Sequence, residues 1–178
     1  QVGCSRTGTF FSCERAGIVP DMVCLSKSIG GYGLPFALTL FKPELDIWSP
    51  GEHNGTFRGQ QLSLVAAKAG LEVMLGEKVE EHTREMGKIV EEFLEKEIKP
   101  INEKIEVRGL GLIWGVDFSA FSEDMTKPLI AECFKRGLIV ERVGRDNNVL
   151  KLMPPLVIED ELLMKGLEIL KESVKAIL

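Results

Sequence analysis

The chain has 178 residues, of which 44% are hydrophobic, and a formal net charge of −5. This size suits one large domain or parts of two, and the apolar content excludes a disordered chain. Acidic residues outnumber basic ones by 27 to 22, and no basic stripe offers the clustered Lys and Arg that nucleic-acid phosphates require. The apolar runs fall short of a bilayer, so we expect neither a membrane span nor a secretory signal.

The cysteines and histidines show no metal-binding pattern. The four cysteines are Cys4, Cys13, Cys24 and Cys133. None belongs to a C-x-x-C pair, and only His53 and His82 could join them, whereas a zinc site needs a tighter cluster. We therefore expect reduced thiols in a cytoplasmic protein, with no metal site.

The first part of the chain predicts two short strands and a helix. A turn leads into a strand at Met22 to Leu25, and a second apolar run spans Ala37 to Phe41. Because a glycine-rich loop joins them, we expect an antiparallel pair. A helix should follow from about residue 60 to 75. The residues expected on its inner face are Leu64, Ala67, Leu71 and Met74.

The remainder predicts an α+β unit. A strongly charged amphipathic helix should run from about residue 78 to 97, and Pro100 ends it. One or two strands with a glycine bend should then cover residues 105–118. The later elements expected are a helix at 126–136, strands at 138–141 and 149–153, and an amphipathic helix at 159–178. Strands covered on one side by helices form an α+β unit from about residue 100 onward.

Lys27 is the most informative single residue. It ends the apolar run Val23 to Leu25, and Gly30 and Gly31 follow it. A strand that delivers one amine to a loop can present it to a carbonyl carbon, because lysine forms Schiff bases with carbonyl substrates and with pyridoxal phosphate. A solvated lysine at a strand end is the alternative that these residues alone leave open.

Four motifs in order carry a resemblance to a known family. They are Gln-x-Gly-x-x-Arg-Thr-Gly at residues 1–8, Pro-Asp-Met-Val-Cys-Leu-Ser-Lys at 20–27, Gly-Glu-His-Asn-Gly-Thr-Phe-Arg-Gly at 51–59 and Leu-Lys-Leu-Met-Pro-Pro-Leu-Val-Ile at 150–158. This series resembles the class III aminotransferases, which are fold-type I pyridoxal-phosphate enzymes. Within them it is most similar to the diaminobutyrate–2-oxoglutarate aminotransferases of ectoine synthesis.

The resemblance covers the whole chain and implies the C-terminal part of such an enzyme. The chain begins at Gln1 without a methionine, which we interpret as sequence from within a domain. The implied fold is α/β plus α+β. Residues 1–75 would end the large cofactor-binding domain, residues 76–99 would form a connecting helix, and residues 100–178 would form the small C-terminal domain.

The resemblance also implies roles for single residues around pyridoxal 5′-phosphate. Lys27 matches the Schiff-base lysine, which also moves the proton at the substrate Cα. Gln1 matches the glutamine that hydrogen-bonds the phenolic oxygen of the cofactor, unless it is a surface glutamine. Thr56 matches the residue that binds the cofactor phosphate of the neighbouring subunit, unless it bonds only its own loop, and Gly55 would allow close approach. Shared sites imply at least a homodimer.

Lys151 is a departure from the family pattern. Many relatives carry an arginine there, which clamps the substrate α-carboxylate. Lysine offers a point charge in place of a planar, two-pronged group, so a carboxylate contact survives with altered geometry. An exposed strand lysine is the alternative. The aspartate that pairs with the pyridinium nitrogen in the family pattern would lie upstream of Gln1, so we expect the isolated 178-residue chain to bind the cofactor poorly and to be inactive.

The implied reaction is transamination between an amino donor, with glutamate and 2-oxoglutarate as the usual pair, and a keto acid or aldehyde. Aspartate semialdehyde, giving L-2,4-diaminobutyrate, is the partner that the subgroup implies. Two alternatives stay open at this point. An aminomutase or racemase of the same fold would need the same Lys27, and a non-catalytic dimerisation fragment would need none of this chemistry.

Overall fold

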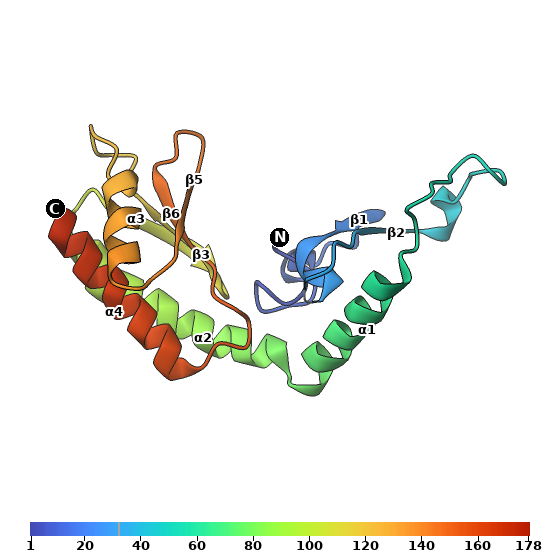
Figure 1. The fold of residues 1–178 in the computed structure, drawn as a ribbon, viewed down its shortest axis with the longest axis horizontal. Coiled ribbons are helices and arrows are strands. Elements are labelled where there is room, and N and C mark those ends of the chain that lie inside the picture. Colours follow the sequence, from blue (N-terminus) through green and yellow to red (C-terminus); the bar gives the residue numbers. More distant parts are fainter. Residues whose placement is uncertain (32) are drawn as a thin grey trace. The chain divides into compact units, whose positions relative to one another are not determined.

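A computed structural model describes residues 1–31 and 33–178. The chain forms two compact units, Gln1–Glu80 and Glu81–Leu178. Figure 1 draws both, and each is described by itself below. The predicted domain limits at residues 75 and 99 stay predictions.

The first unit contains the predicted antiparallel strand pair. Strand β1 (Met22–Leu25) pairs with β2 (Leu38–Phe41), and the register places Leu25 opposite Leu38. Helix α1 (Gln61–Gly76) agrees with the predicted helix to within one residue. The short 3-10 turns of this unit are η1 (Ser12–Ala16), η2 (Lys27–Gly30) and η3 (Pro43–Leu45).

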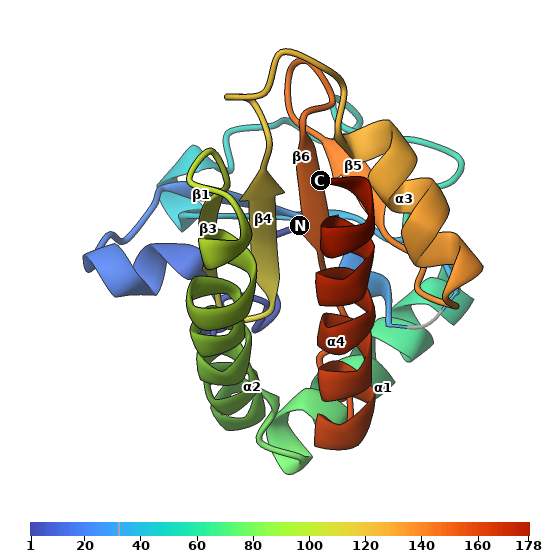
Figure 2. The same ribbon diagram turned by 90° about the vertical axis from the view of Figure 1, so that its left-hand side faces the viewer.

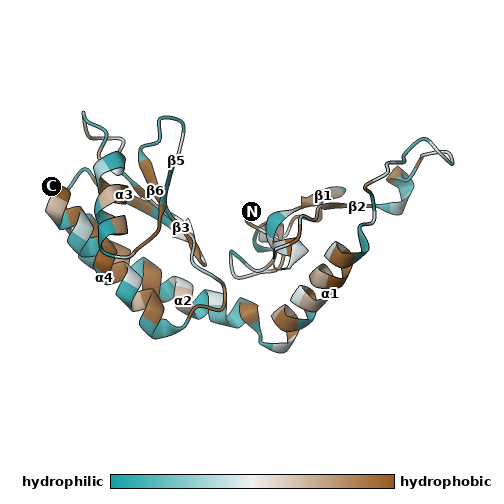
Figure 3. Cartoon of the chain, viewed as in Figure 1, coloured by the Kyte–Doolittle hydropathy of each residue, from teal (hydrophilic) through white to brown (hydrophobic). Residues whose placement is uncertain are grey.

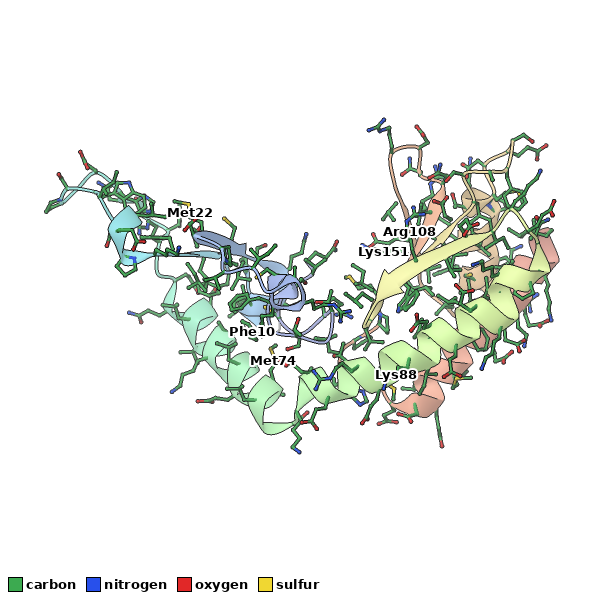
Figure 4. The ribbon with its side chains drawn as sticks, turned by 180° about the vertical axis from the view of Figure 1, so that it is seen from behind. Phe10, Met22, Met74, Lys88, Arg108 and Lys151 are labelled. Atoms are coloured by element: carbon green, nitrogen blue, oxygen red, sulfur yellow. The ribbon has the colours of Figure 1, made fainter. Side chains whose placement is uncertain are left out.

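The small core of this unit joins the strand pair to α1. Its buried residues are Cys4, Leu25 and Ile29, and the partly buried residues around them include Phe10, Leu71 and Met74. Figure 4 shows Phe10 and Met74 close together. One predicted core position is wrong, because Leu64 is 44% exposed, whereas Ser63 and Ala67 are buried. The inner face of α1 therefore begins one residue earlier, at a polar side chain that hydropathy does not select.

The second unit is one four-stranded sheet with helices on one face (Figure 2). The sheet order is β3-β4-β6-β5, and all neighbouring pairs are antiparallel. The strands are β3 (Glu106–Leu110), β4 (Ile113–Asp117), β5 (Glu141–Val143) and β6 (Val149–Leu152). The helices are α2 (Val79–Phe93), α3 (Thr126–Lys135) and α4 (Asp160–Ile177).

The core of this unit lies between the sheet and its helices. Both α2 and α4 alternate between hydrophobic and hydrophilic residues along their length (Figure 3). Burial alternates along strand β4: Trp114 and Val116 are buried, while their neighbours in the strand are half-buried. Buried residues that come from both layers include Met86, Val90, Leu94, Ile98, Leu112, Phe118, Leu150, Leu167, Leu170 and Val174.

One predicted boundary in this unit is wrong, and one predicted helix takes another form at its end. Helix α2 ends at Phe93 and continues as a π-helical turn, Leu94–Ile98, so the helical stretch ends within one residue of the predicted position. Leu94 and Ile98 are both fully buried. The strand predicted at residues 138–141 begins only at Glu141. The Leu138 N–H donates to the Cys133 carbonyl and so caps α3. That donor is therefore not free for a strand ladder.

Two glycines test the packing of a helix against its sheet. A Cβ on Gly87 of α2 would lie 2.8 Å from the backbone of Gly111, whereas a Cβ on Gly76 of α1 would meet nothing within 4 Å. We expect Gly87→Ala to lower the free energy of unfolding by about 1–3 kcal/mol, because backbone cannot move aside as a side chain can. Gly76→Ala should leave stability unchanged or raise it by about 0.5–1 kcal/mol. Urea unfolding of both variants measures this, and equal effects would contradict the close contact.

Candidate active site

Lys27 lies where β1 ends and the turn η2 begins. Its φ of +57° is in the left-handed region, which a residue with a Cβ rarely adopts. Such a conformation costs on the order of 1–3 kcal/mol and persists only where the surrounding structure imposes it. The side chain is exposed and borders an open cavity of about 500 Å³. The other residues that line this cavity are Ser26, Leu34, Pro35, Phe36 and Ala37.

The local fold holds Lys27 between two fixed points. On one side, β1 is paired with β2 up to Leu25. On the other side, Ile29 is only 4% exposed, and the Gly31 N–H donates to the Ser28 carbonyl at 3.1 Å. The chain therefore turns sharply after the strand, with the exposed lysine at the turn.

Gln1 belongs to the same region of the first unit. It is exposed and lines a second cavity of about 340 Å³ together with Ser26 and Ser28, the two neighbours of Lys27. Ser26 borders both cavities. The structure therefore brings Gln1 near the strand end that carries the lysine. The two serines are not among the residues that the motifs select, although the sequence shows a hydroxyl on each side of the candidate lysine.

Thr56 and Gly55 lie elsewhere, in an exposed loop of the same unit. Neither residue lines the two cavities beside Lys27. Within the loop, Arg58 donates to the His53 carbonyl and its side chain lies 3.3 Å from where a Gly55 Cβ would be. Phe57 is 95% exposed. Thr56 is itself exposed, and it does not line the cavity that Lys27 borders.

Lys151 lies in the second unit, on β6. Its side chain is only 13% exposed and forms an ion pair with Glu141, which stands opposite it on β5. It is therefore not the exposed strand lysine that the sequence left as an alternative. On its other side Lys151 faces Gly115 of β4, and Arg108 of β3 faces the same glycine.

Arg108, Gly115 and Lys151 stand side by side on three neighbouring strands. The two cations, Arg108 and Lys151, therefore lie on one face of the sheet, with Gly115 between them. Figure 4 labels both Arg108 and Lys151. Arg108 Nη1 lies 2.6 Å from Asp117 Oδ2. Burial opposes ionisation of Asp117, but hydrogen bonds from Ser119 and Arg108 outweigh it and hold the pKa of this carboxyl below its usual value. Each cation on this face thus has a carboxylate partner.

The residues around Lys27 fit part of a pyridoxal-phosphate site. An exposed amine at an open cavity can reach an aldehyde, and the apolar wall of Leu34, Pro35 and Phe36 can border an aromatic ring. Across residues 1–31 and 33–178, no group of three or more His, Cys, Asp or Glu side chains could hold a metal ion. Over the same residues, no helix is both long and apolar enough to cross a bilayer.

Solved structures share this fold. The acetylornithine aminotransferase of Elizabethkingia anophelis matches 98% of the chain at a TM-score of 0.88 and 29% identity, over 45% of its own length. An ornithine aminotransferase of Toxoplasma gondii, described with partial occupancy of PLP at its active site, matches 99% at a TM-score of 0.92 and 26% identity, over 42% of its length. The fold is that of the fold-type I pyridoxal-phosphate aminotransferases.

The family assignment follows from the sequence match. The profile of the family "Aminotransferase class-III" matches residues 1–174, and the chain belongs to this family, whose members depend on pyridoxal 5′-phosphate. The diaminobutyrate–2-oxoglutarate transaminase of Halalkalibacterium halodurans is 51% identical over 180 residues, and that of Wolinella succinogenes 48% over 179. The chain spans about 41% of the length of each of these relatives, and 99–100% of the chain is covered. The predicted family and fold class are thereby confirmed.

Proposed function

We propose that the protein carrying this chain is a pyridoxal-phosphate-dependent transaminase. It moves the amino group of glutamate to aspartate semialdehyde and so forms 2-oxoglutarate and L-2,4-diaminobutyrate. The observation that carries this proposal is Lys27, an exposed amine in a left-handed backbone conformation at a strand end, in a chain that matches the family along 1–174. The names of the relatives that are 51% and 48% identical, both diaminobutyrate–2-oxoglutarate transaminases, support the choice of substrates.

Lys27 would act twice in the first half-reaction and would perform the same two steps in reverse in the second. When bound, the cofactor supplies an aldehyde that condenses with amines and a ring that accepts the electron pair left on the substrate Cα. The Nζ of Lys27 would hold the cofactor until the amino group of the substrate displaces it. Once free, the same Nζ would take the proton from Cα and return it to the cofactor carbon, because displacement leaves the amine beside both atoms.

Gln1 and Thr56 would bind the two ends of the cofactor. The Gln1 side-chain amide would donate to the phenolic oxygen, which agrees with its place on the cavity wall beside Ser26 and Ser28. The Thr56 hydroxyl and backbone N–H would donate to the phosphate of a neighbouring subunit, and Gly55 would leave space for that approach. The outward position of this loop supports a site shared within a homodimer.

Lys151 would bind the substrate α-carboxylate. Its ion pair with Glu141 supports this role, since the amine already holds one carboxylate in the structure. A substrate carboxylate would replace the Glu141 carboxylate at the same Nζ. A point charge tolerates more than one carboxylate geometry, so the selectivity of this contact would be lower than that of an arginine.

Product analysis of the full-length protein tests the proposed function. With pyridoxal phosphate, glutamate and aspartate semialdehyde, we expect equal amounts of 2-oxoglutarate and 2,4-diaminobutyrate. Omitting the semialdehyde should stop turnover after one half-reaction. Continued turnover of a single amino acid without any keto substrate would indicate an aminomutase or racemase, and no turnover with any amino donor would indicate a non-catalytic chain.

The charge at Lys151 should determine substrate affinity. We expect Lys151→Ala to raise the KM for glutamate by roughly tenfold to a hundredfold, because a hydrogen bond to a charged group is worth about 1.5–3 kcal/mol. Lys151→Arg should retain binding, since the charge is kept. Glu141→Gln is the matched control, which releases the amine and should lower KM. An unchanged KM in Lys151→Ala would exclude this residue from the substrate site.

We further propose that the isolated 178-residue chain binds the cofactor poorly. In the described part of the first unit, Thr56, the residue proposed to bind the phosphate, lines neither of the two cavities beside Lys27. Within one chain the phosphate would therefore lack this contact. Titration of the purified chain with pyridoxal phosphate should give weak, non-stoichiometric binding. Tight binding that disappears in Lys27→Ala would show that the chain is sufficient by itself.

A further inference from the structure

Gly31, which follows the turn η2, lies directly against helix α1. A Cβ added to Gly31 would stand 2.5 Å from the Ala66 carbonyl oxygen, and one added to Gly70 would stand 3.2 Å from the Gly31 Cα. The φ of Gly31 is +67°. Two backbones therefore meet here with no space for a side chain, and only glycine fits at position 31.

This contact is linked to Lys27 through a tight turn. The Gly31 N–H donates to the Ser28 carbonyl at 3.1 Å, and Ile29 is buried between them. On the other side of Lys27, the strand pairing fixes Leu25. A displacement of Gly31 from α1 would therefore change the backbone angles at Lys27. Lys27 is the one residue of η2 with a positive φ, and such a strained conformation depends on the structure around it.

The same face of α1 also holds the chain beyond the turn. The Ser63 hydroxyl donates to the Pro35 carbonyl at 3.0 Å, and the Gln60 side chain accepts from the Ser63 N–H at 2.5 Å, which caps the helix. Ser63 is 1% exposed. Successive turns of α1 therefore contact Pro35, through Ser63, and Gly31, through Ala66. Pro35 lines the cavity that Lys27 borders, and Gly31 follows the turn that carries Lys27.

We propose that Gly31 is a positioning residue for Lys27: its backbone contact with Ala66 and Gly70 determines where the lysine amine lies. The inference rests on the proposed role of Lys27. It gives helix α1 a role in holding the turn that follows β1. A misplacement of about 1 Å at a reacting group can cost on the order of a hundredfold in rate, so a small shift of this contact is enough to be measured.

The test compares two alanine substitutions in the full-length protein. Gly31→Ala introduces the clash with α1, whereas Gly33→Ala is the matched control, because Gly33 also has a positive φ, +79°, but a Cβ there meets nothing within 4 Å. With pyridoxal phosphate bound, we expect Gly31→Ala to lower kcat by on the order of a hundredfold while KM changes by less than about threefold. Gly33→Ala should keep kcat within about threefold of the parent protein.

A second measurement needs no cofactor. Acetic anhydride in limiting amount labels amines in proportion to their reactivity, and mass spectrometry gives the ratio of label at Lys27 to label at Lys68, an exposed lysine of α1. We expect Gly31→Ala to change this ratio by at least about threefold. A displaced amine meets different solvent and different neighbouring charges, and both affect its reactivity. Gly33→Ala should leave the ratio unchanged. Thermal unfolding confirms that each variant is folded.

A variant on the opposite side of the contact covers the case in which Gly31→Ala fails to fold. Gly70→Val should alter the labelling ratio in the same direction, and Gly76→Val, at a position of the same helix with nothing within 4 Å, should not. Equal ratios in folded Gly31→Ala, Gly70→Val and both controls would overturn the inference. Attachment of the cofactor to a residue other than Lys27 would instead refute the proposed function. The labelling ratio would still show whether the contact of Gly31 with α1 determines the position of the Lys27 amine.

Discussion

Replacing Lys27 by alanine is expected to lower transamination by the full-length protein by about ten-thousandfold, the upper range for loss of a positioned acid–base group. The expected effect is large because the same Nζ holds the cofactor and moves the proton, and no second lysine lines the cavity that Lys27 borders in the described residues. Initial rates with glutamate and aspartate semialdehyde measure the loss.

Two further variants separate chemistry from charge. Lys27→Arg keeps a cation at the turn but removes the nucleophilic amine, so it should be as inactive as Lys27→Ala. Lys68→Ala removes an exposed lysine of α1 whose side chain is 79% exposed, and it should keep full activity. Activity in Lys27→Arg comparable with that of the parent protein would contradict a covalent role.

Replacing Phe118 by alanine is expected to lower the free energy of unfolding of the second unit by about 3–5 kcal/mol. Phe118 follows β4, is 1% exposed, and packs against Phe121 with ring centroids 5.8 Å apart. Phe134→Ala is the matched control, because that ring on α3 is 69% exposed and its loss should change stability by less than about 0.5 kcal/mol.

Trp114 reports the unfolding of this unit. It is 6% exposed, and its indole N–H donates to the Gly111 carbonyl at 2.8 Å. In the 178-residue chain, a Trp48→Phe background removes the other tryptophan, so the fluorescence of Trp114 in a urea titration follows the second unit alone. Similar midpoints for Phe118→Ala and Phe134→Ala would contradict the described core.

The elements of the fold were predictable wherever hydropathy follows a clear period. The pair β1–β2, the helices α3 and α4, and the strands β3 and β4 follow such patterns, and their boundaries differ from the predicted ones by only a few residues. Errors occurred where another interaction decides. The inner face of α1 starts at Ser63, whose hydroxyl is satisfied by Pro35, and no apolar period marks such a position.

The strand β5 shows a second reason for error. Residues 138–140 are as apolar as a strand, but the Leu138 N–H caps α3, so the ladder starts only where Glu141 meets Lys151. Hydropathy does not encode which partner a backbone donor takes. Hydropathy also does not distinguish the π-helical turn after α2 from a regular helical turn, because Leu94 and Ile98 would lie on one face in either form.

The motifs selected single candidate residues but not how these residues assemble. The motifs selected Lys27 and Gln1, which the structure places at neighbouring cavities, and also Thr56 and Lys151, which it places elsewhere in the chain. The ion pair of Lys151 with Glu141 could not be predicted either, because it depends on the register of β5 against β6.

The attachment site of the cofactor tests the central claim most directly. The full-length protein would be loaded with pyridoxal phosphate, reduced with borohydride, digested and mapped by mass spectrometry. We predict a single stoichiometric label on Lys27, in the peptide that follows β1. A label on another residue, or no label at all, would contradict the account.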